Sequence, residues 1–267
     1  MAQPGFHLEG NAARQYEQGI VPTMSQPLAE MLFEHVVLHD GDRVVDVACG
    51  TGILARVATA RFANIASMTG VDLNPAMLDI ARANAPSTRT AIAWQQGDAC
   101  HLPFPDHSFD VVLCQHGLQF MPDQEGALHE MRRVLVPGGR VALIVWGDPP
   151  PYQAALAEAL RRHVSQAAAT SCLAPFALRD VDALSRLVVD AEFHDIAIQT
   201  LVLMRRLPWS VVAFAAQQPY GRDVEAVSEA ARAAIEHEVQ ATVQAYRADN
   251  ECVILPQESH LVHARRG

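Results

Sequence analysis

The nine residues from Val44 to Gly52, Val-Val-Asp-Val-Ala-Cys-Gly-Thr-Gly, constrain this chain more than any other part of its sequence. A β-branched run ends in a turn of small residues with glycines at 50 and 52, and an amphipathic stretch from Ile53 to Phe62 follows at once. This pattern predicts a buried strand, a tight turn and a helix. The glycines let a ligand approach the backbone, and the helix N-terminus offers free N–H donors. The segment therefore predicts a site for a nucleotide-type cofactor.

Strand-like and helix-like runs alternate from residue 43 to residue 147. Such alternation is typical of right-handed βαβ units, which form a parallel sheet with helices on both faces. After Asp148-Pro-Pro-Pro the alternation stops, and no convincing crossover separates the last two strand-like runs. We therefore expect an α/β fold with a doubly wound, mostly parallel, seven-stranded Rossmann-like sheet, an antiparallel C-terminal strand and helical lid insertions. The expected strands are 43–48, 67–73, 92–97, 109–115, 140–147, 194–207 and 259–265, and the expected helices are 11–18, 25–38, 53–61, 75–84, 124–136, 152–169, 181–191 and two within 208–248.

This pattern divides the chain into three parts. Residues 1–40 are expected to be helical, with Ser25 as the N-cap of the second helix. Residues 41–148 form the cofactor-binding core. Residues 149–267 complete the sheet and carry a helical insert at about 208–248, which is rich in the apolar residues expected of a lid over an apolar or aromatic molecule.

The charge and cysteine content exclude several classes of protein to which this chain could belong. The 267 residues carry a formal net charge of −10, which disfavours a general nucleic-acid binder. The basic pairs Arg205-Arg206 and Arg265-Arg266 are expected to be solvated strand ends. The five cysteines include no C-x-x-C pair, so we expect free thiols and no metal site. No run reaches the ~20 apolar residues of a membrane span, and residues 1–11 lack the features of a signal peptide, so a cytoplasmic location is expected.

Three acidic residues lie in or after consecutive predicted strands. Asp46 lies inside the first strand, where an acid would repel a pyrophosphate but suits a sulfonium with an α-ammonium group; its alternative role is to shape the glycine turn through hydrogen bonds. Asp72 can accept hydrogen bonds from the hydroxyls of a ribose, or cap the helix at Pro75. Asp98 can accept from an adenine amine, or form an Asx turn.

The glycine turn by itself leaves the cofactor open. Gly50-Thr-Gly-Ile-Leu-Ala55 also satisfies the dinucleotide pattern G-x-G-x-x-A, so an NAD(P)-dependent oxidoreductase remains an alternative. A non-catalytic cofactor-binding module is a second alternative.

Six short motifs follow one another between residues 46 and 139. They are Asp46-Val-Ala-Cys-Gly-Thr-Gly, Gly70-Val-Asp-Leu-Asn-Pro-Ala-Met, Gly97-Asp-Ala, Leu102-Pro-Phe-Pro, Ser108-Phe-Asp-Val-Val and Arg133-Val-Leu-Val-Pro-Gly-Gly. In this order the chain resembles class I S-adenosylmethionine-dependent methyltransferases, and is most similar to the branch of ubiquinone/menaquinone-biosynthesis C-methyltransferases. The resemblance covers about residues 40–147 and departs from the family at Ala48, where the family often has glycine. It implies S-adenosylmethionine as the cofactor.

The resemblance also implies roles for individual residues. The glycine turn would line the methionine end of the cofactor, Asp72 would bind the ribose, and two apolar residues after it would pack against the adenine. Residues after the third strand would hold the adenine edge, and Gln115 would lie near the methionine moiety. N-terminal helices of such enzymes often fold over the cofactor, which adds Tyr16, although ordinary core packing is its alternative role. The implied cofactor-binding residues are Tyr16, Asp46, Ala48, Gly50, Gly52, Asp72, Leu73, Met77, Gly97, Asp98, Ala99 and Gln115.

The expected reaction is in-line transfer of a methyl group from a sulfonium to a nucleophile. Since the leaving group is a neutral thioether, the enzyme would act mainly by alignment and by exclusion of water. An oxygen or neutral nitrogen acceptor needs a base, for which His116 is best placed, and Gln119 could orient a substrate. The acidity disfavours a protein or RNA substrate, so we expect a small apolar or aromatic acceptor, either quinone-like or a natural product. The sequence leaves open the acceptor's identity, C-, O- or N-selectivity and the oligomeric state.

Overall fold

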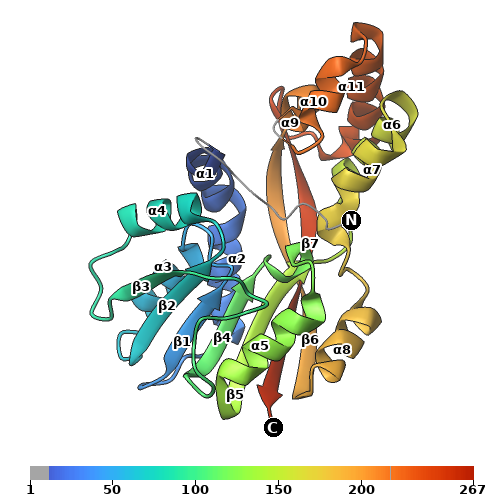
Figure 1. The fold of residues 1–267 in the computed structure, drawn as a ribbon. Helices are drawn as coiled ribbons and strands as arrows, with labels where there is room; N and C mark the ends of the chain where they lie inside the picture. Colours follow the sequence, from blue (N-terminus) through green and yellow to red (C-terminus); the bar gives the residue numbers. More distant parts are fainter. Residues whose placement is uncertain (1–11, 217) are drawn as a thin grey trace. The chain divides into compact units, whose positions relative to one another are not determined.

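The computed structural model describes residues 12–216 and 218–267. Its strands are Arg43–Val47 (β1), Ser67–Asp72 (β2), Ile92–Gln96 (β3), Phe109–Gln115 (β4), Leu135–Trp146 (β5), Phe193–Pro208 (β6) and Cys252–Arg266 (β7). They form one seven-stranded sheet in the order β3-β2-β1-β4-β5-β7-β6 (Figure 1). Strands β1 to β5 are parallel to one another and the C-terminal strand is antiparallel, which confirms the predicted α/β sheet.

Helices follow most strands, and several begin at residues that cap them well. The side chains of Asn74, Asp123 and Asp180 each accept a hydrogen bond from a backbone N–H of the first helical turn. The helices are Ala12–Gln15 (α1), Tyr16–Ser25 (η1, a π-helix), Gln26–His35 (α2), Ile53–Arg61 (α3), Pro75–Ala83 (α4), Leu118–Phe120 (η2), Gln124–Val134 (α5), Pro151–His163 (α6), Gln166–Leu173 (α7), Ala174–Phe176 (η3), Val181–Asp190 (α8), Val211–Ala215 (α9), Gly221–Ala226 (α10), Glu229–Val243 (α11) and Gln244–Tyr246 (η4).

The chain divides into two compact units, and each is described here by itself. Unit 1 takes the described residues up to Val145, with Asp180–Leu201 and His260–Gly267; unit 2 takes Trp146–Arg179 and Val202–Ser259. Both β6 and β7 contribute residues to both units. The division of the chain into 1–40, 41–148 and 149–267 is a division by function and stays a prediction.

In unit 1, successive residues of each strand face opposite sides of the sheet. Val44, Val111 and Ala142 are buried in one cluster with residues of α2 and α3. Val45 and Val112, the next residues along β1 and β4, are also fully buried and, by this alternation, face the opposite side of the sheet. Since a buried valine side chain contributes roughly 1.5–3 kcal/mol, burial on both faces holds these strands firmly in place.

The N-terminal helices differ from the prediction. Elements α1, η1 and α2 follow one another without a break, and Ser25 has helical backbone angles and caps nothing. Its hydroxyl lies 3.2 Å from the hydroxyl of Tyr16 instead. The prediction of Ser25 as an N-cap is therefore wrong, because the helix does not begin there. The first residue of the predicted helix, Asn11, lies outside the described residues.

Other boundaries also differ. The helix predicted over 152–169 is two helices, because Ser165 interrupts it and caps α7 by accepting a hydrogen bond from Ala168 N at 3.1 Å. Three α-helices, α9 to α11, replace the two predicted within 208–248. Strand β5 begins earlier than predicted, because Leu135 pairs with Phe109 across a register shift. Strand β7 begins at Cys252 rather than at residue 259.

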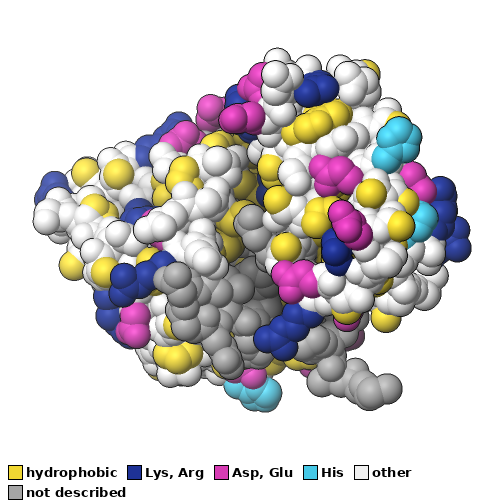
Figure 2. Space-filling model, turned by 90° about the horizontal axis from the view of Figure 1, so that it is seen from above, with side chains coloured by type: hydrophobic (Ala, Val, Ile, Leu, Met, Phe, Trp, Pro, Cys, Tyr) yellow, Lys and Arg dark blue, Asp and Glu magenta, His cyan; other side chains and the backbone are white. Residues whose placement is uncertain are grey.

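The surface carries mixed charge on the face that Figure 2 shows. Acidic and basic side chains are interspersed there with hydrophobic and uncharged ones, without a continuous basic area (Figure 2). A continuous basic area is what binding to a phosphate backbone requires. Among the described residues, no helix is both long and apolar enough to cross a membrane.

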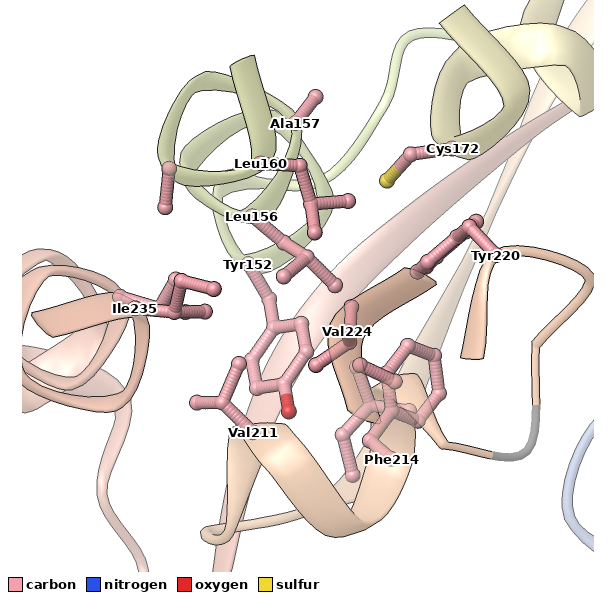
Figure 3. Close-up of a cluster of buried hydrophobic side chains, with 14 of the residues drawn as sticks. Tyr152, Leu156, Ala157, Leu160, Cys172, Val211, Phe214, Tyr220, Val224 and Ile235 are labelled. Carbon is pink, nitrogen blue, oxygen red and sulfur yellow. The ribbon is translucent and has the colours of Figure 1, made fainter. Parts of the chain in front are cut away.

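Unit 2 has a hydrophobic core of its own. Tyr152 and Leu156 of α6 are fully buried and lie among side chains of α9, α10 and α11 (Figure 3). The rings of Tyr152 and Phe214 meet edge to face with their centroids 5.3 Å apart. Val253 and Leu255 of β7 belong to the same buried cluster. The two units therefore carry separate clusters of buried side chains.

Candidate cofactor site

The candidate site of unit 1 is built on the carboxyl ends of adjacent parallel strands. Asp46 of β1 pairs in register with Gly70 of β2 and with Leu113 of β4. Residues that follow each of these strands therefore emerge at the same edge of the sheet. In open α/β sheets this edge is where ligands bind.

The glycine turn joins β1 to α3 and adopts the backbone that its sequence predicts. Gly50 and Gly52 have φ angles of 55° and 82°, in the left-handed region that favours glycine. A Cβ on Gly50 would meet no atom within 4 Å, so this side of the turn is open. A Cβ on Gly52 would lie 2.2 Å from the ring of Trp94, which packs closely against the turn. Gly50 therefore leaves room for a ligand, whereas Gly52 leaves room for the tryptophan.

Asp72 ties the turn to the next two loops. Its Oδ2 accepts a hydrogen bond from Gly50 N at 2.8 Å, and its Oδ1 accepts one from Asn74 N at 2.8 Å. Its backbone oxygen accepts from Gly97 N at 3.0 Å. The helix at Pro75 is capped by Asn74 rather than by Asp72. The structure thus brings together the turn, the acid of the second strand and the end of the third.

Asp46 is a buried carboxylate at the centre of this edge. Its side chain is 1% exposed, and Oδ2 has no hydrogen-bond partner among the described residues. Burial raises the pKa of Asp46 well above its usual value, the negative charge of Asp72 raises it further, and a hydrogen bond from the Ala55 backbone offsets part of this. A nearby cation would stabilise this carboxylate, so the position favours a positively charged ligand.

The residues after β3 form a turn that is held in place by packing. Asp98 Oδ1 accepts a hydrogen bond from Cys100 N at 2.9 Å, which makes the Asx turn that the sequence allows. A Cβ on Gly97 would lie 2.8 Å from Pro103, so a glycine is needed for this contact. Ala99 lies within the turn, between Asp98 and Cys100.

Two apolar residues near Asp72 differ in exposure. Leu73 is 51% exposed, which is unusual for a leucine and leaves an apolar surface beside the site. Met77 of α4 is buried at 4% exposure and belongs to the interior of unit 1. Leu73 is therefore available to a ligand, whereas the side chain of Met77 is buried.

Ala48 and His116 occupy strained positions at the ends of β1 and β4. Their φ angles are 56° and 54°, a region that residues with a Cβ rarely adopt. A Cβ on Gly117 would lie 2.7 Å from the Cβ of Ala48, so the two chain segments are in close contact. Gly117 is a site residue that the sequence analysis missed, because a glycine after a strand carries no signal of its own. His116 N donates to Ile144 O at 2.7 Å.

The N-terminal π-helix contacts the same region through two predicted residues. Gln115 Nε2 donates to Ser25 O at 2.8 Å, and Oε1 of this amide has no partner among the described residues. Burial raises the pKa of Tyr16, the hydrogen bond with Ser25 offsets part of this rise, and the negative charge of Asp72 adds to it. The π-helix therefore lies beside the site, and π-helical segments are frequent at functional sites.

Gln119 in the short helix η2 is a second buried amide. Its side chain is 4% exposed, and neither amide atom has a hydrogen-bond partner among the described residues. A buried amide without partners costs roughly 1–3 kcal/mol. This cost is recovered if a ligand hydrogen-bonds to the amide.

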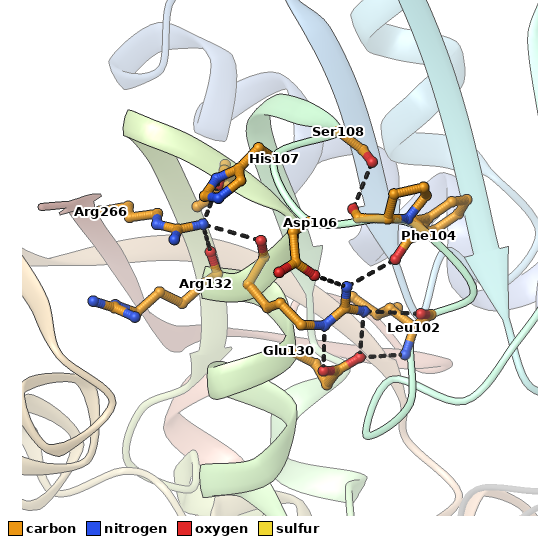
Figure 4. A network of polar contacts seen from close by, with 11 residues as sticks. Leu102, Phe104, Asp106, His107, Ser108, Glu130, Arg132 and Arg266 are labelled. Atoms are coloured by element: carbon orange, nitrogen blue, oxygen red, sulfur yellow. Dashed lines mark hydrogen bonds and ion pairs between the residues drawn. The ribbon is translucent and has the colours of Figure 1, made fainter.

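Two of the sequence motifs form a structural network rather than a binding surface. Arg133 of α5 donates to Glu130, to Asp106 and to the backbone oxygens of Leu102 and Phe104, at 2.6–3.0 Å (Figure 4). Glu130 in turn accepts from Leu102 N at 2.7 Å. The network fixes the loop between β3 and β4, which continues from the turn at Asp98. Among the described residues, no cluster of acids, histidines and cysteines could hold a metal ion.

Comparisons with known proteins agree on this core. Residues 45–143 match the family model described as a methyltransferase domain. Demethylmenaquinone methyltransferase of Deinococcus radiodurans is 43% identical over 113 residues, which are 42% of this chain and 46% of that protein. The 2-phytyl-1,4-naphtoquinone methyltransferase of Synechococcus elongatus is 40% identical over 106 residues, 39% of this chain and 46% of that protein. A solved phosphoethanolamine N-methyltransferase 2 of Haemonchus contortus, in complex with phosphomonomethylethanolamine and S-adenosylhomocysteine, is 20% identical with a TM-score of 0.58, over 96% of this chain and 57% of that one.

Residues 45–143 therefore match a methyltransferase domain, and the resemblance to quinone-biosynthesis methyltransferases is confirmed over this part of the chain. The chain spans about half the length of the curated relatives it matches. The family match ends at residue 143, before unit 2 begins at Trp146. The solved structure, at its low identity, shows a shared fold alone.

Proposed function

We propose that this protein transfers a methyl group from S-adenosylmethionine to a small apolar or aromatic molecule. The observation that carries the proposal is the meeting of a buried, incompletely paired Asp46, the open side of Gly50 and the carboxylate of Asp72 at one sheet edge. A nicotinamide dinucleotide presents a pyrophosphate, which Asp46 would repel. A sulfonium with an α-ammonium group would instead bring positive charge next to the carboxylate of Asp46.

The residues present fit S-adenosylmethionine, which, when bound, supplies a methyl group on a positively charged sulfur. Asp46, Ala48, Gly50 and Gly52 would line its methionine end, with Gln115 and Tyr16 on the side of the π-helix. Asp72 would bind the ribose, Leu73 would cover the adenine with Met77 beneath, and Gly97, Asp98 and Ala99 would hold its edge. Buried side chains at this edge exclude water from the transfer.

We propose that His116 and Gln119 act on the acceptor. Gln119 has an amide with two atoms unsatisfied by the described residues, which suits hydrogen bonding to an acceptor oxygen. His116 would remove the proton from an oxygen or nitrogen acceptor. The names of the relatives support a quinone-like acceptor. The matched segment covers 46% of the length of each of the two relatives described above.

Calorimetry with S-adenosylhomocysteine and NADH side by side tests the cofactor. We expect binding of S-adenosylhomocysteine, no signal with NADH, and a loss of about 10- to 100-fold in affinity for Asp72→Ala, since a charged hydrogen-bond partner is removed. Asp79→Ala is the matched control, because Asp79 is exposed and pairs with Arg82 on the surface. Binding of NADH without S-adenosylhomocysteine would overturn the proposal in favour of an oxidoreductase.

Mass spectrometry of a reaction with reduced 1,4-naphthoquinones and simple phenols tests methyl transfer itself. A mass increase of one methyl group in any acceptor, together with formation of S-adenosylhomocysteine, is the expected result. A protein that binds the cofactor but methylates none of a broad panel is the non-catalytic module instead.

A further inference from the structure

Trp94 belongs to the third strand of the sequence, yet its side chain lies over the second. In the parallel register of the sheet, Trp94 of β3 lies beside Gly70 of β2, and Gly70 lies beside Asp46 of β1. Residues in register on adjacent strands face the same side of the sheet, so these three share one face. A Cβ on Gly70 would lie 2.4 Å from the indole, which therefore fills the space that a side chain at this position would need.

The same ring closes one side of the glycine turn. A Cβ on Gly52 would lie 2.2 Å from the indole, and the atoms of Trp94 nearest to both glycines all belong to its six-membered ring. Gly52 has a φ of 82° and directly precedes the first residue of α3. The absence of a side chain at Gly70 thus lets a residue of β3 support the turn that follows β1.

The indole N–H makes no contribution to this contact. Nε1 of Trp94 is buried and has no hydrogen-bond partner among the described residues, although a buried tryptophan N–H usually has one. A buried polar group without a partner costs free energy of folding. A shorter apolar side chain would avoid this cost but would not reach Gly52. What the indole supplies here is therefore its length.

The turn that Trp94 supports carries backbone groups of the candidate site. Gly50 N donates to the carboxylate of Asp72 at 2.8 Å, and Gly52 O accepts from Arg56 N at 3.0 Å at the start of α3. A shift of Gly52 would therefore displace both the open side of the turn and the first turn of the helix. Binding sites tolerate displacements of only about 0.5 Å.

We propose that Trp94 is a positioning residue, whose indole lies across Gly70 and holds the glycine turn in the shape that binds the methionine end of the cofactor. The inference rests on the proposed function, to which it adds a residue that contacts the turn rather than the ligand. Trp94 lies outside the six sequence motifs, between the one that ends at Met77 and the one that begins at Gly97.

Calorimetry with S-adenosylhomocysteine tests this role in Trp94→Leu, in Gly70→Ala and in the double variant, at a temperature where all are folded. Trp94→Leu should bind about tenfold or more weakly, because small displacements of binding groups are costly. Gly70→Ala should also bind weakly, because its Cβ displaces the indole. The double variant should bind more tightly than Gly70→Ala alone, because leucine leaves room for the added methyl group.

Phe33→Leu is the matched control. Phe33 of α2 is 1% exposed and belongs to the buried cluster against which Trp94 packs. Its truncation should lower the unfolding temperature and leave the affinity unchanged. Unchanged affinity in Trp94→Leu, an equal loss in Phe33→Leu, or losses that simply multiply in the double variant overturn the inference alone. A wild-type protein that does not bind S-adenosylhomocysteine overturns the proposed function as well.

Trp94→Phe supplies a spectroscopic readout that a merely structural role would not give. Of the three tryptophans in the sequence, Trp94 alone lies in unit 1. Tryptophan emission of the wild-type protein should change during titration with S-adenosylhomocysteine, with the midpoint that calorimetry gives. Trp94→Phe keeps a ring over Gly70, so it should bind more tightly than Trp94→Leu but lack this change in emission. A change of equal size in Trp94→Phe would contradict the proposed contact between the indole and the cofactor-binding turn.

Discussion

At the scale of single residues, the candidate site contains several interactions that disfavour folding. Asp46 is a buried carboxylate beside a second negative charge, Gln119 is a buried amide without partners among the described residues, and Ala48 and His116 have left-handed backbones. Each costs free energy of folding, and residues of this kind cluster at functional sites, where a ligand compensates them.

Asp46→Asn should stabilise the folded protein at neutral pH. The pKa of Asp46 is raised in the folded state, so the folded protein holds this proton more tightly than the unfolded chain. The contribution of Asp46 to stability is therefore full below its unfolded pKa and is lost as pH rises through the folded pKa. Urea denaturation from pH 4 to pH 8 should show the Asp46→Asn variant gaining stability over the wild-type protein as pH rises. A constant difference across this range would contradict the assignment.

The same substitution should weaken cofactor binding by about tenfold or more, since it removes a charged partner. Calorimetry with S-adenosylhomocysteine measures this loss. Asp110→Asn serves as the control, because Asp110 pairs with Arg43 at the opposite end of the strands and should leave cofactor affinity unchanged.

Ala48→Gly should stabilise the protein by about 0.5–1 kcal/mol. The left-handed backbone at φ 56° costs a residue with a Cβ about 1–2 kcal/mol, which exceeds the entropic cost of a new glycine. Chemical denaturation measures the change. The control is Ala60→Gly at an exposed position of α3, which should lower stability by about 0.5–1 kcal/mol. If both substitutions stabilised the protein, the left-handed backbone at Ala48 would not be the reason.

At the scale of elements, the N-terminal π-helix is fastened to the core by few polar contacts. Glu17 and Arg56 of α3 pair at 2.8 Å with both side chains mostly buried, and Gln115 of β4 donates to Ser25 O. An element held in this way can open locally without the sheet.

Arg56→Met should therefore loosen this element selectively. It leaves Glu17 buried without its partner, at a cost of about 1–2 kcal/mol after allowance for partial exposure. Hydrogen exchange should accelerate in η1 and remain slow in β1 and β4. Arg82→Met, which breaks the exposed pair with Asp79, should cost under about 0.5 kcal/mol, and uniform acceleration in either variant would refute local opening.

Boundaries within elements show where local sequence was insufficient. Strands β1 and β4 agree closely with prediction, because their apolar runs end in residues that stop a strand. Ser25 and Ser165 are chemically equal candidates for an N-cap, yet only Ser165 caps a helix. The helix before Ser25 continues through it because tertiary contacts support a π-helix there.

At the scale of the whole molecule, two buried cores serve two proposed tasks. Unit 1 contains the methyltransferase domain and the candidate cofactor site, whereas unit 2 lies beyond the family match. The family match therefore says nothing about residues of unit 2.

Leu156→Ala and Leu113→Ala should separate these tasks. Both leucines are fully buried, Leu156 in unit 2 and Leu113 in unit 1, and each truncation should cost about 2–5 kcal/mol. Leu156→Ala should speed hydrogen exchange in α6 and α11 and reduce acceptor methylation while S-adenosylhomocysteine affinity is kept. Leu113→Ala should speed exchange in β1 and β4 and weaken that affinity. Equal loss of affinity in both variants would show that the cores act as one.

The parallel sheet, the glycine turn and the acids in or after three successive strands could all be predicted from the sequence alone. These features depend on local patterns. Alternating apolar residues, glycines that accept a positive φ, and carboxylates in or after a strand can each be recognised within a few consecutive residues. Three features became visible in the folded chain alone: Asp72 accepts a hydrogen bond from Gly50 N, Asp46 is buried with Oδ2 unpaired among the described residues, and Gly117 lies against Ala48. Contacts between distant segments depend on how the elements pack, and no local pattern encodes that packing.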